Sequence, residues 1–102
     1  GKKVDFIVID VSFISLTKVI PYLERFIAEG SQEMMLIKPQ FEVGREKIGR
    51  NGIVIEESYH DEAVKKIIEC YSQHNYELVG KTDSAINGTK GNKEFLILIT
   101  KK

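Results

Sequence analysis

The sequence predicts an α/β fold: a partial, mainly parallel sheet with two main helices, closed by an antiparallel hairpin at its C-terminal end. Strand-like and helix-like segments alternate along most of the chain, which is typical of parallel sheets. The last two strand-like segments have only a turn-rich connection between them, as antiparallel neighbours do. With 102 residues, the chain is long enough for one domain with its own core.

The first strand is expected at Val4–Asp10, where β-branched and aromatic residues are nearly continuous after Asp5. Such a run is typical of a strand that is buried on both faces. An amphipathic helix is expected from Leu16 to Glu29, because apolar residues recur there at helical spacing and Gly30 supplies a C-terminal stop. Pro21 lies inside this pattern and either marks the first turn or kinks the helix.

The second strand is expected at Met34–Lys38, because Pro39 discourages its continuation. The stretch Gln40–Ile55 is rich in glycine and charge, and its apolar residues follow neither the helical nor the strand period. It is therefore predicted to be a long loop, and loops of this length are usually functional or mobile. Ser58 and Asp61 have the spacing of a capping box.

A second helical stripe follows that box and is expected to end near His74. The last quarter of the chain predicts strands at Tyr76–Lys81 and Glu94–Thr100, with turns through Asn87-Gly88 between them. Because crossovers between parallel strands are right-handed, both helices are expected on the same face of the sheet. The opposite face and the edge of the first strand would then be open, which predicts a homodimer or larger assembly.

Three charged residues are expected to meet at one edge of this sheet. Asp10 and Lys38 close the first two strands, and Glu94 opens an antiparallel strand, whose beginning lies at that same edge. A lysine and two carboxylates in one crevice can orient or deprotonate a hydroxyl group. From spacing alone, an exposed ion pair of Lys38 with one of the acids is the commoner explanation.

Other reactive side chains have structural interpretations. Cys70 lies in a helical pattern and is expected to be a small, half-buried thiol. His60 and His74 flank a helix without a second ligand at metal spacing, so no metal site is predicted.

The charge of the chain gives no general attraction to nucleic acid, since fifteen basic residues balance fifteen acidic ones. A modest basic cluster in the long loop is diluted by two acids, so a solvated loop is as good an interpretation as a phosphate track. Its members are Lys38, Arg45, Lys47 and Arg50, with Glu42 and Glu46 among them. No apolar run is long enough to cross a bilayer, and the start has no signal-peptide pattern, so a cytoplasmic location is expected.

Three strings carry a family resemblance: DVSFISL at residues 10–16, LIKPQFE at residues 36–42 and GNKEFL at residues 91–96. They resemble the C-terminal motifs of the TlyA-type hemolysin and ribosomal RNA methyltransferase family, which belongs with the FtsJ-like ribose 2′-O-methyltransferases. The likeness runs from about Val4 to the last strand and includes Gly44-Arg45 and Gly52 in the long loop. It implies a Rossmann-like fold and methyl transfer from S-adenosylmethionine to a ribose 2′-hydroxyl of rRNA.

The resemblance also implies roles for residues. FtsJ-like enzymes use a Lys-Asp-Lys-Glu tetrad, and Asp10, Lys38 and Glu94 match its last three members. Lys38 would then activate the 2′-hydroxyl, while the two acids hold the reacting groups in line. The first lysine of the tetrad has no match, because Lys2 and Lys3 stand too close to the first strand.

The family's glycine-rich turn for the methyl donor has no counterpart in this sequence, so only Asp10, Val11 and Ser12 are candidates for contact with it. Residues 1–102 are therefore expected to be a single domain, the C-terminal half of a methyltransferase domain, without the cofactor-binding half or the family's S4-like RNA-binding domain. We expect the chain to be inactive alone and to bind no cofactor. The alternative is a non-catalytic module that binds RNA or protein. No segment supports the membrane damage that the name hemolysin implies.

Overall fold

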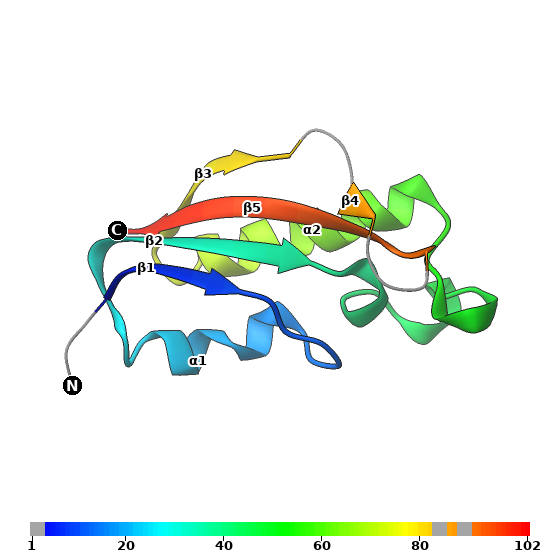
Figure 1. The fold of residues 1–102 in the computed structure, drawn as a ribbon, viewed down its shortest axis with the longest axis horizontal. Coiled ribbons are helices and arrows are strands. Elements are labelled where there is room, and N and C mark those ends of the chain that lie inside the picture. The colour runs from blue at the N-terminus through cyan, green and yellow to red at the C-terminus, as the bar shows by residue number, and fades with distance from the viewer. Residues whose placement is uncertain (1–3, 83–85, 88–90) are drawn as a thin grey trace.

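The protein forms a mixed sheet whose strands lie in the order β1, β2, β5, β3 (Figure 1). The computed structural model describes residues 4–82, 86–87 and 91–102. The strands of this sheet are β1 (Val4–Ile9), β2 (Ile27–Ile37), β3 (Tyr76–Lys81) and β5 (Lys93–Lys101), and the short β4 (Ile86–Asn87) pairs with the start of β5.

Strand β1 runs parallel to β2, whereas β5 runs antiparallel to both β2 and β3. The predicted parallel sheet with a C-terminal antiparallel pair is thus confirmed. The sequence did not predict that β5 inserts between β2 and β3, nor that β4 forms. Lys2, Lys3 and Gly88 of the expected Asn87-Gly88 turn lie outside the described residues.

The helix expected at Leu16–Glu29 is wrong. A 3₁₀ turn at Leu16–Lys18 leads into α1, which covers only Ile20–Leu23 and carries a proline in its first turn, where the missing N–H costs little. The chain then enters β2 at Ile27. The helical spacing correctly identified buried residues in this region, but the last of them, Ile27, belongs to strand β2.

Strand β2 is longer than the predicted Met34–Lys38, because it begins at Ile27. Its pairing with β1 jumps from Val4 opposite Ile27 to Phe6 opposite Gln32, so extra residues of β2 bulge there. Gly30 lies in the bulge with a φ of 85°, a conformation that glycine adopts without a steric cost. This glycine bends a strand and does not end a helix.

The second predicted helix is α2, which covers Glu57–Ser72. Its buried side follows the helical period through Ala63, Ile67 and Tyr71. The capping box is wrong, because the cap position is Glu56, whose side chain makes no capping hydrogen bond.

The long loop before α2 has no α-helix or strand, as predicted. It contains three 3₁₀ turns, Pro39–Phe41, Arg45–Lys47 and Arg50–Gly52.

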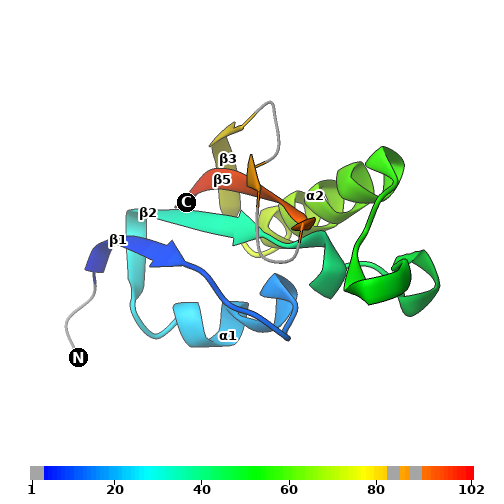
Figure 2. The ribbon, with the colours of Figure 1, turned by 45° about the vertical axis from the view of Figure 1, so that its right-hand side comes forward.

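Both helical segments cover the same face of the sheet, in agreement with the prediction. Side chains from the α1 region and from α2 belong to one core cluster, together with Met35 opposite Ile97 in the sheet. Figure 2 shows α1 beside the β1–β2 half and α2 beside the β5–β3 half.

The alternate residues of the strands point to the other face, where no described helix joins them to the core cluster. Six of them are apolar: Phe6, Val8, Met34, Leu36, Leu96 and Leu98. Gln32 and Thr100, which pair with each other, are polar. Val8 is 65% exposed, so this open face is a real apolar surface of the described structure.

Candidate functional site

Asp10 and Lys38 meet directly beyond the ends of β1 and β2. The Lys38 Nζ lies 2.5 Å from the Asp10 Oδ1 and donates to the Ser12 Oγ at 3.0 Å. The lysine side chain is only 12% exposed, whereas that of Asp10 is 55% exposed. The ends of the two parallel strands thus position an ion pair in which the Lys38 amine is mostly enclosed and the Asp10 carboxylate faces solvent.

Glu94 lies near the start of β5 and is buried. It shares with Lys38 the wall of a cavity of about 360 Å³. The lining residues are Ser12, Phe13, Lys38, Gln40, Phe41, Asn51, Gly52, Asn92 and Glu94. The structure therefore places Lys38 between Asp10 on one side and a cavity that also contains Glu94.

Phe13 is an unusual residue at this cavity. Its side chain is 90% exposed, its φ is 67°, and its ring centroid lies 5.2 Å from that of Phe41. A bulky residue with positive φ is a strained conformation that persists only where neighbouring contacts hold it, and such residues concentrate at functional sites. The two rings give the cavity an aromatic side that sequence reasoning did not identify.

Asn92 fixes the loop that borders Glu94. Its Oδ1 accepts from the backbone N–H of Val54 at 3.0 Å, and its Nδ2 donates to the carbonyl oxygen of Gly52 at 2.9 Å. Because Asn92 is buried and precedes Glu94 by two residues, these two bonds hold the cavity wall against β5. The position of this asparagine in the GNKEFL string was the only sequence signal for it.

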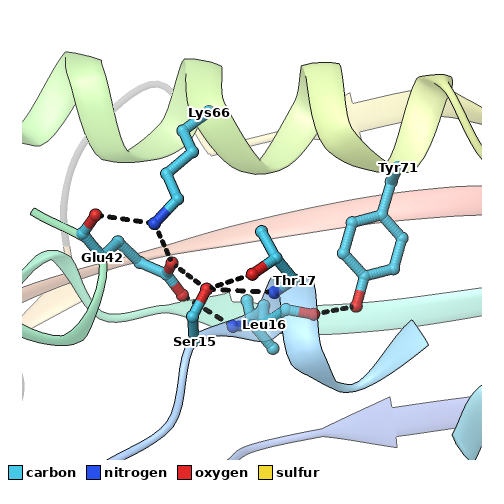
Figure 3. Close-up of polar contacts among 6 residues, drawn as sticks. All are labelled: Ser15, Leu16, Thr17, Glu42, Lys66 and Tyr71. Atoms are coloured by element: carbon cyan, nitrogen blue, oxygen red, sulfur yellow. Dashed lines mark hydrogen bonds and ion pairs between the residues drawn. The ribbon is translucent and has the colours of Figure 1, made fainter. Parts of the chain in front are cut away.

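Glu42 is buried, not part of a solvated loop as expected. Figure 3 shows its carboxylate among Ser15, Leu16 and Lys66, with Ser15 Oγ donating at 2.6 Å and Leu16 N at 2.8 Å. The expected basic cluster is correspondingly broken up, since Lys38 pairs with Asp10 and Lys47 lies 2.7 Å from Glu62 of α2. Glu46 is exposed.

Two of the three residues predicted to contact S-adenosylmethionine lie exposed in the structure. Asp10 and Ser12 are exposed at the rim and could contact such a molecule, but Val11 packs against the core. The segment after β1 contains no glycine before α1 and opens on a 3₁₀ turn and a four-residue helix, so it lacks the glycine-rich turn and long helix N-terminus that receive nucleotide-like cofactors.

The remaining reactive side chains have structural partners. His60 Nε2 lies 2.7 Å from the Val54 carbonyl oxygen, and His74 Nδ1 lies 2.9 Å from the Cys70 carbonyl oxygen. Cys70 is half-buried, as expected, and burial raises the pKa of its thiol. No group of three potential metal ligands occurs within residues 4–82, 86–87 and 91–102.

A larger hollow, of about 540 Å³, lies between α2 and the β3 and β5 strands. Its charged residues are of both signs and include Asp61, Lys65 and Lys81. Lys81 closes β3, but the acids of this hollow come from α2, and none of the predicted residues Asp10, Lys38 and Glu94 lines it. The smaller cavity is therefore the candidate site.

Comparison with known proteins agrees on one family. The family model of FtsJ-like methyltransferases matches residues 1–101. A candidate rRNA methyltransferase of Bacillus subtilis, YqxC, is 43% identical over 91% of this chain and 33% of its own length. The 16S/23S rRNA (cytidine-2′-O)-methyltransferase TlyA of Mycobacterium tuberculosis is 33% identical over 95% of this chain and 36% of its own length.

A solved structure has the same fold. A candidate hemolysin from Streptococcus thermophilus superposes with a TM-score of 0.89 at 42% identity, covering 96% of this chain and 35% of that one. The chain thus spans about a third of the length of the curated relatives it matches. Among the helices that the structure describes, none is both long and apolar enough to cross a membrane.

Proposed function

The chain belongs to the FtsJ-like methyltransferase family, and we propose that it is part of an enzyme that methylates a ribose 2′-hydroxyl of ribosomal RNA. Relatives that are named for rRNA methylation match almost the whole chain. They are nearly three times as long, so we assign the activity to a longer protein of which this chain is the C-terminal catalytic half, and we expect the chain to be inactive alone. The cytoplasm is its proposed location, because rRNA is the substrate.

One observation carries the proposal: Lys38 is held by Asp10 at 2.5 Å on the border of a cavity that also contains Glu94. The amine is mostly enclosed, so water screens its charge less than it would at an open surface. This is the arrangement that activation of a hydroxyl group requires.

Each residue has a separate task in this proposal. Lys38 directs its amine at the ribose oxygen and either stabilises the charge that develops there or takes the proton. Asp10 orients the lysine, and Glu94, which lines the same cavity as Lys38, holds the hydroxyl. The exposed Phe13 ring, tilted by 51° to that of Phe41, offers an apolar face that suits stacking of a nucleobase.

The methyl group would come from S-adenosylmethionine in the complete enzyme. Because the described residues form only a rim for such a donor, we expect the isolated 102-residue chain to bind none. Calorimetry with S-adenosylmethionine measures this directly, and clear saturation would show that the donor site lies within the chain after all.

The activity test uses the longer protein, purified ribosomal subunits and S-adenosylmethionine with a labelled methyl group. We expect Lys38→Ala to reduce methyl transfer by a factor of about 10² to 10⁴, the usual contribution of a positioned acid or base, and to leave donor affinity unchanged. Lys47→Ala is the control, because Lys47 pairs with Glu62 away from the cavity. Retained turnover in Lys38→Ala contradicts the role of Lys38. RNA binding without any transfer by the unaltered protein favours the non-catalytic alternative.

We also propose that the isolated chain forms a homodimer. Its open sheet face carries Val8 and five other apolar side chains, and β1 is an edge strand among the described strands. Burying such a surface against a second copy removes apolar area from water and can pair the free edge. Light scattering after size exclusion at micromolar concentration should give more than the monomer mass. A monomer under these conditions contradicts the proposal.

A further inference from the structure

Two connecting segments are joined by a series of contacts near the candidate site. Residues 10–16 follow β1, and residues 38–42 follow β2. Asp10 and Ser12 contact Lys38, the Phe13 ring faces Phe41, and Ser15 and Leu16 contact Glu42. The contacts advance in the same order along both segments, so the two connectors lie side by side over their whole length.

Glu42 forms the last and most buried of these contacts. Its side chain is 1% exposed, yet both carboxylate oxygens have donors, Ser15 Oγ at Oε1 and Leu16 N at Oε2. Lys66 of α2 lies 3.2 Å from Oε1 and also donates to the Glu42 carbonyl oxygen at 2.8 Å (Figure 3). A buried carboxylate is stable only with such partners, and hydrogen bonds to a charged group are the strong ones.

The strained residue of the site lies inside this series. Phe13 has a positive φ and an exposed ring, and so its own burial does not fix it. On its N-terminal side the chain is held by the bond from Lys38 to Ser12, and on its C-terminal side by the bonds of Ser15 and Leu16 to Glu42. Removing the second anchor would leave the strained turn held at one end only.

Glu42 does not line the cavity, so any effect on the site passes through its neighbours. We infer that Glu42 is a positioning residue: its buried carboxylate anchors residues 10–16 to residues 38–42 and thereby fixes Phe13 and the Asp10–Lys38 pair at the cavity. Which reaction the positioned site performs rests on the proposed function, whereas the anchoring by Glu42 does not depend on it.

The charge and the reach of Glu42 are both required. A glutamine has one acceptor oxygen, so Glu42→Gln leaves either Ser15 or Leu16 without its acceptor and removes the partner charge of Lys66. The matched control is Glu62→Gln, because Glu62 is also a carboxylate paired with a lysine but lies on the exposed side of α2.

The first test follows Phe13 by fluorine NMR in the 102-residue chain labelled with 4-fluorophenylalanine, with the signal assigned by Phe13→Leu. In Glu42→Gln we expect the Phe13 signal to move toward the position of the free amino acid and to sharpen. The signal of Phe95, which packs against the core, should stay in place. Glu62→Gln should change neither signal. An unchanged Phe13 signal in Glu42→Gln overturns the inference.

If the Phe95 signal leaves its folded position in Glu42→Gln, that variant does not fold, and a second variant is used instead. Ser15→Ala removes only one of the donors to Glu42 and keeps the carboxylate. The Phe13 signal should then shift in the same direction by a smaller amount while Phe95 is unaffected. No shift of Phe13 in this variant also overturns the inference.

The activity test uses the longer enzyme and separates kcat from KM. We expect Glu42→Gln to lower kcat by a factor of about 10 to 100, the effect of misplacing reacting groups, with KM for S-adenosylmethionine unchanged, and Glu62→Gln to retain both values. Wild-type kcat in Glu42→Gln counts against the inference and leaves the proposed function intact. If the unaltered enzyme transfers no methyl group, the proposed function is wrong. The anchoring by Glu42 is then tested by the Phe13 signal alone.

Discussion

Glu33 and Glu42 are both buried carboxylates, one in β2 and the other just beyond it, but their surroundings differ completely. Glu42 has donors on both oxygens and a lysine beside it. Neither carboxylate oxygen of Glu33 has a hydrogen-bond partner among the described residues, and the same is true of the hydroxyl of nearby Tyr76. Burial raises the pKa of Glu33 to about 7, against the smaller opposing effect of Lys101.

The difference shows that burial by itself does not define what a carboxylate does. At the cavity end of β2, polar atoms are paired with specific donors and hold two segments in place. In the interior of β2, Glu33 lowers the cost of its burial by keeping its proton up to near neutral pH. We therefore expect changes at the two glutamates to affect different measurements: activity and local order for Glu42, and pH-dependent stability for Glu33.

The largest effect on stability is expected for Glu33→Gln. The folded chain binds the Glu33 proton more tightly than the unfolded chain does, with a pKa of about 7 against an ordinary 4.5. Stability from this group is fully present below about pH 4.5 and is lost as the pH rises through 7. Glu33→Gln carries no charge, so it should be more stable than the unaltered chain at pH 8 by about 3 kcal/mol and close to it at pH 4.5.

Urea denaturation of both chains at pH 4.5, 6 and 8 measures this difference. Other groups that titrate contribute equally to the two chains, so the comparison isolates Glu33. A difference that stays constant across this range shows that Glu33 is already ionised in the folded state and that unseen partners satisfy it.

A smaller effect on stability is expected for a contact of Leu16, whose backbone N–H donates to Glu42. The Tyr71 hydroxyl donates to the Leu16 carbonyl oxygen at 2.7 Å, and burial raises the pKa of this phenol, so it stays protonated as a donor. Tyr71→Phe removes the bond, but the carbonyl keeps the N–H of Val19 at 3.2 Å. We expect a loss of about 1 kcal/mol, independent of pH between 5 and 8.

The same urea series tests this expectation, with Glu62→Gln as the control for an exposed pair, for which we expect no measurable change. A loss in Tyr71→Phe that grows with pH would show that the α2 contact is coupled to Glu33. The surroundings of Glu33 and Glu42 would then not be independent of each other.

Much of the fold could be predicted from local patterns. The continuous apolar run at Val4–Ile9 and the helical stripe of α2 gave elements close to those observed, because each pattern has a single way to bury its apolar side chains. The region 16–29 misled for a physical reason: its apolar residues suit a short helical turn followed by a strand as well as they suit one helix.

The candidate site was predictable only in part. Asp10, Lys38 and Glu94 could be found because strand ends concentrate functional groups and three strings resemble a family. The roles of Phe13, Glu42 and Asn92 depend on contacts with residues far away in sequence, and no spacing within the chain shows these contacts.

The amino-acid sequence by itself determined most of the elements, their order and the family, since these follow from local periodicity and short motifs. Only the tertiary structure decided that β5 lies between β2 and β3, that Glu42 is buried and paired, and that Glu33 is buried without a hydrogen-bond partner among the described residues. The reason is that hydrogen bonding and burial are properties of pairs of distant segments. The same glutamate side chain is a charged anchor in one setting and a proton-holding group in the other.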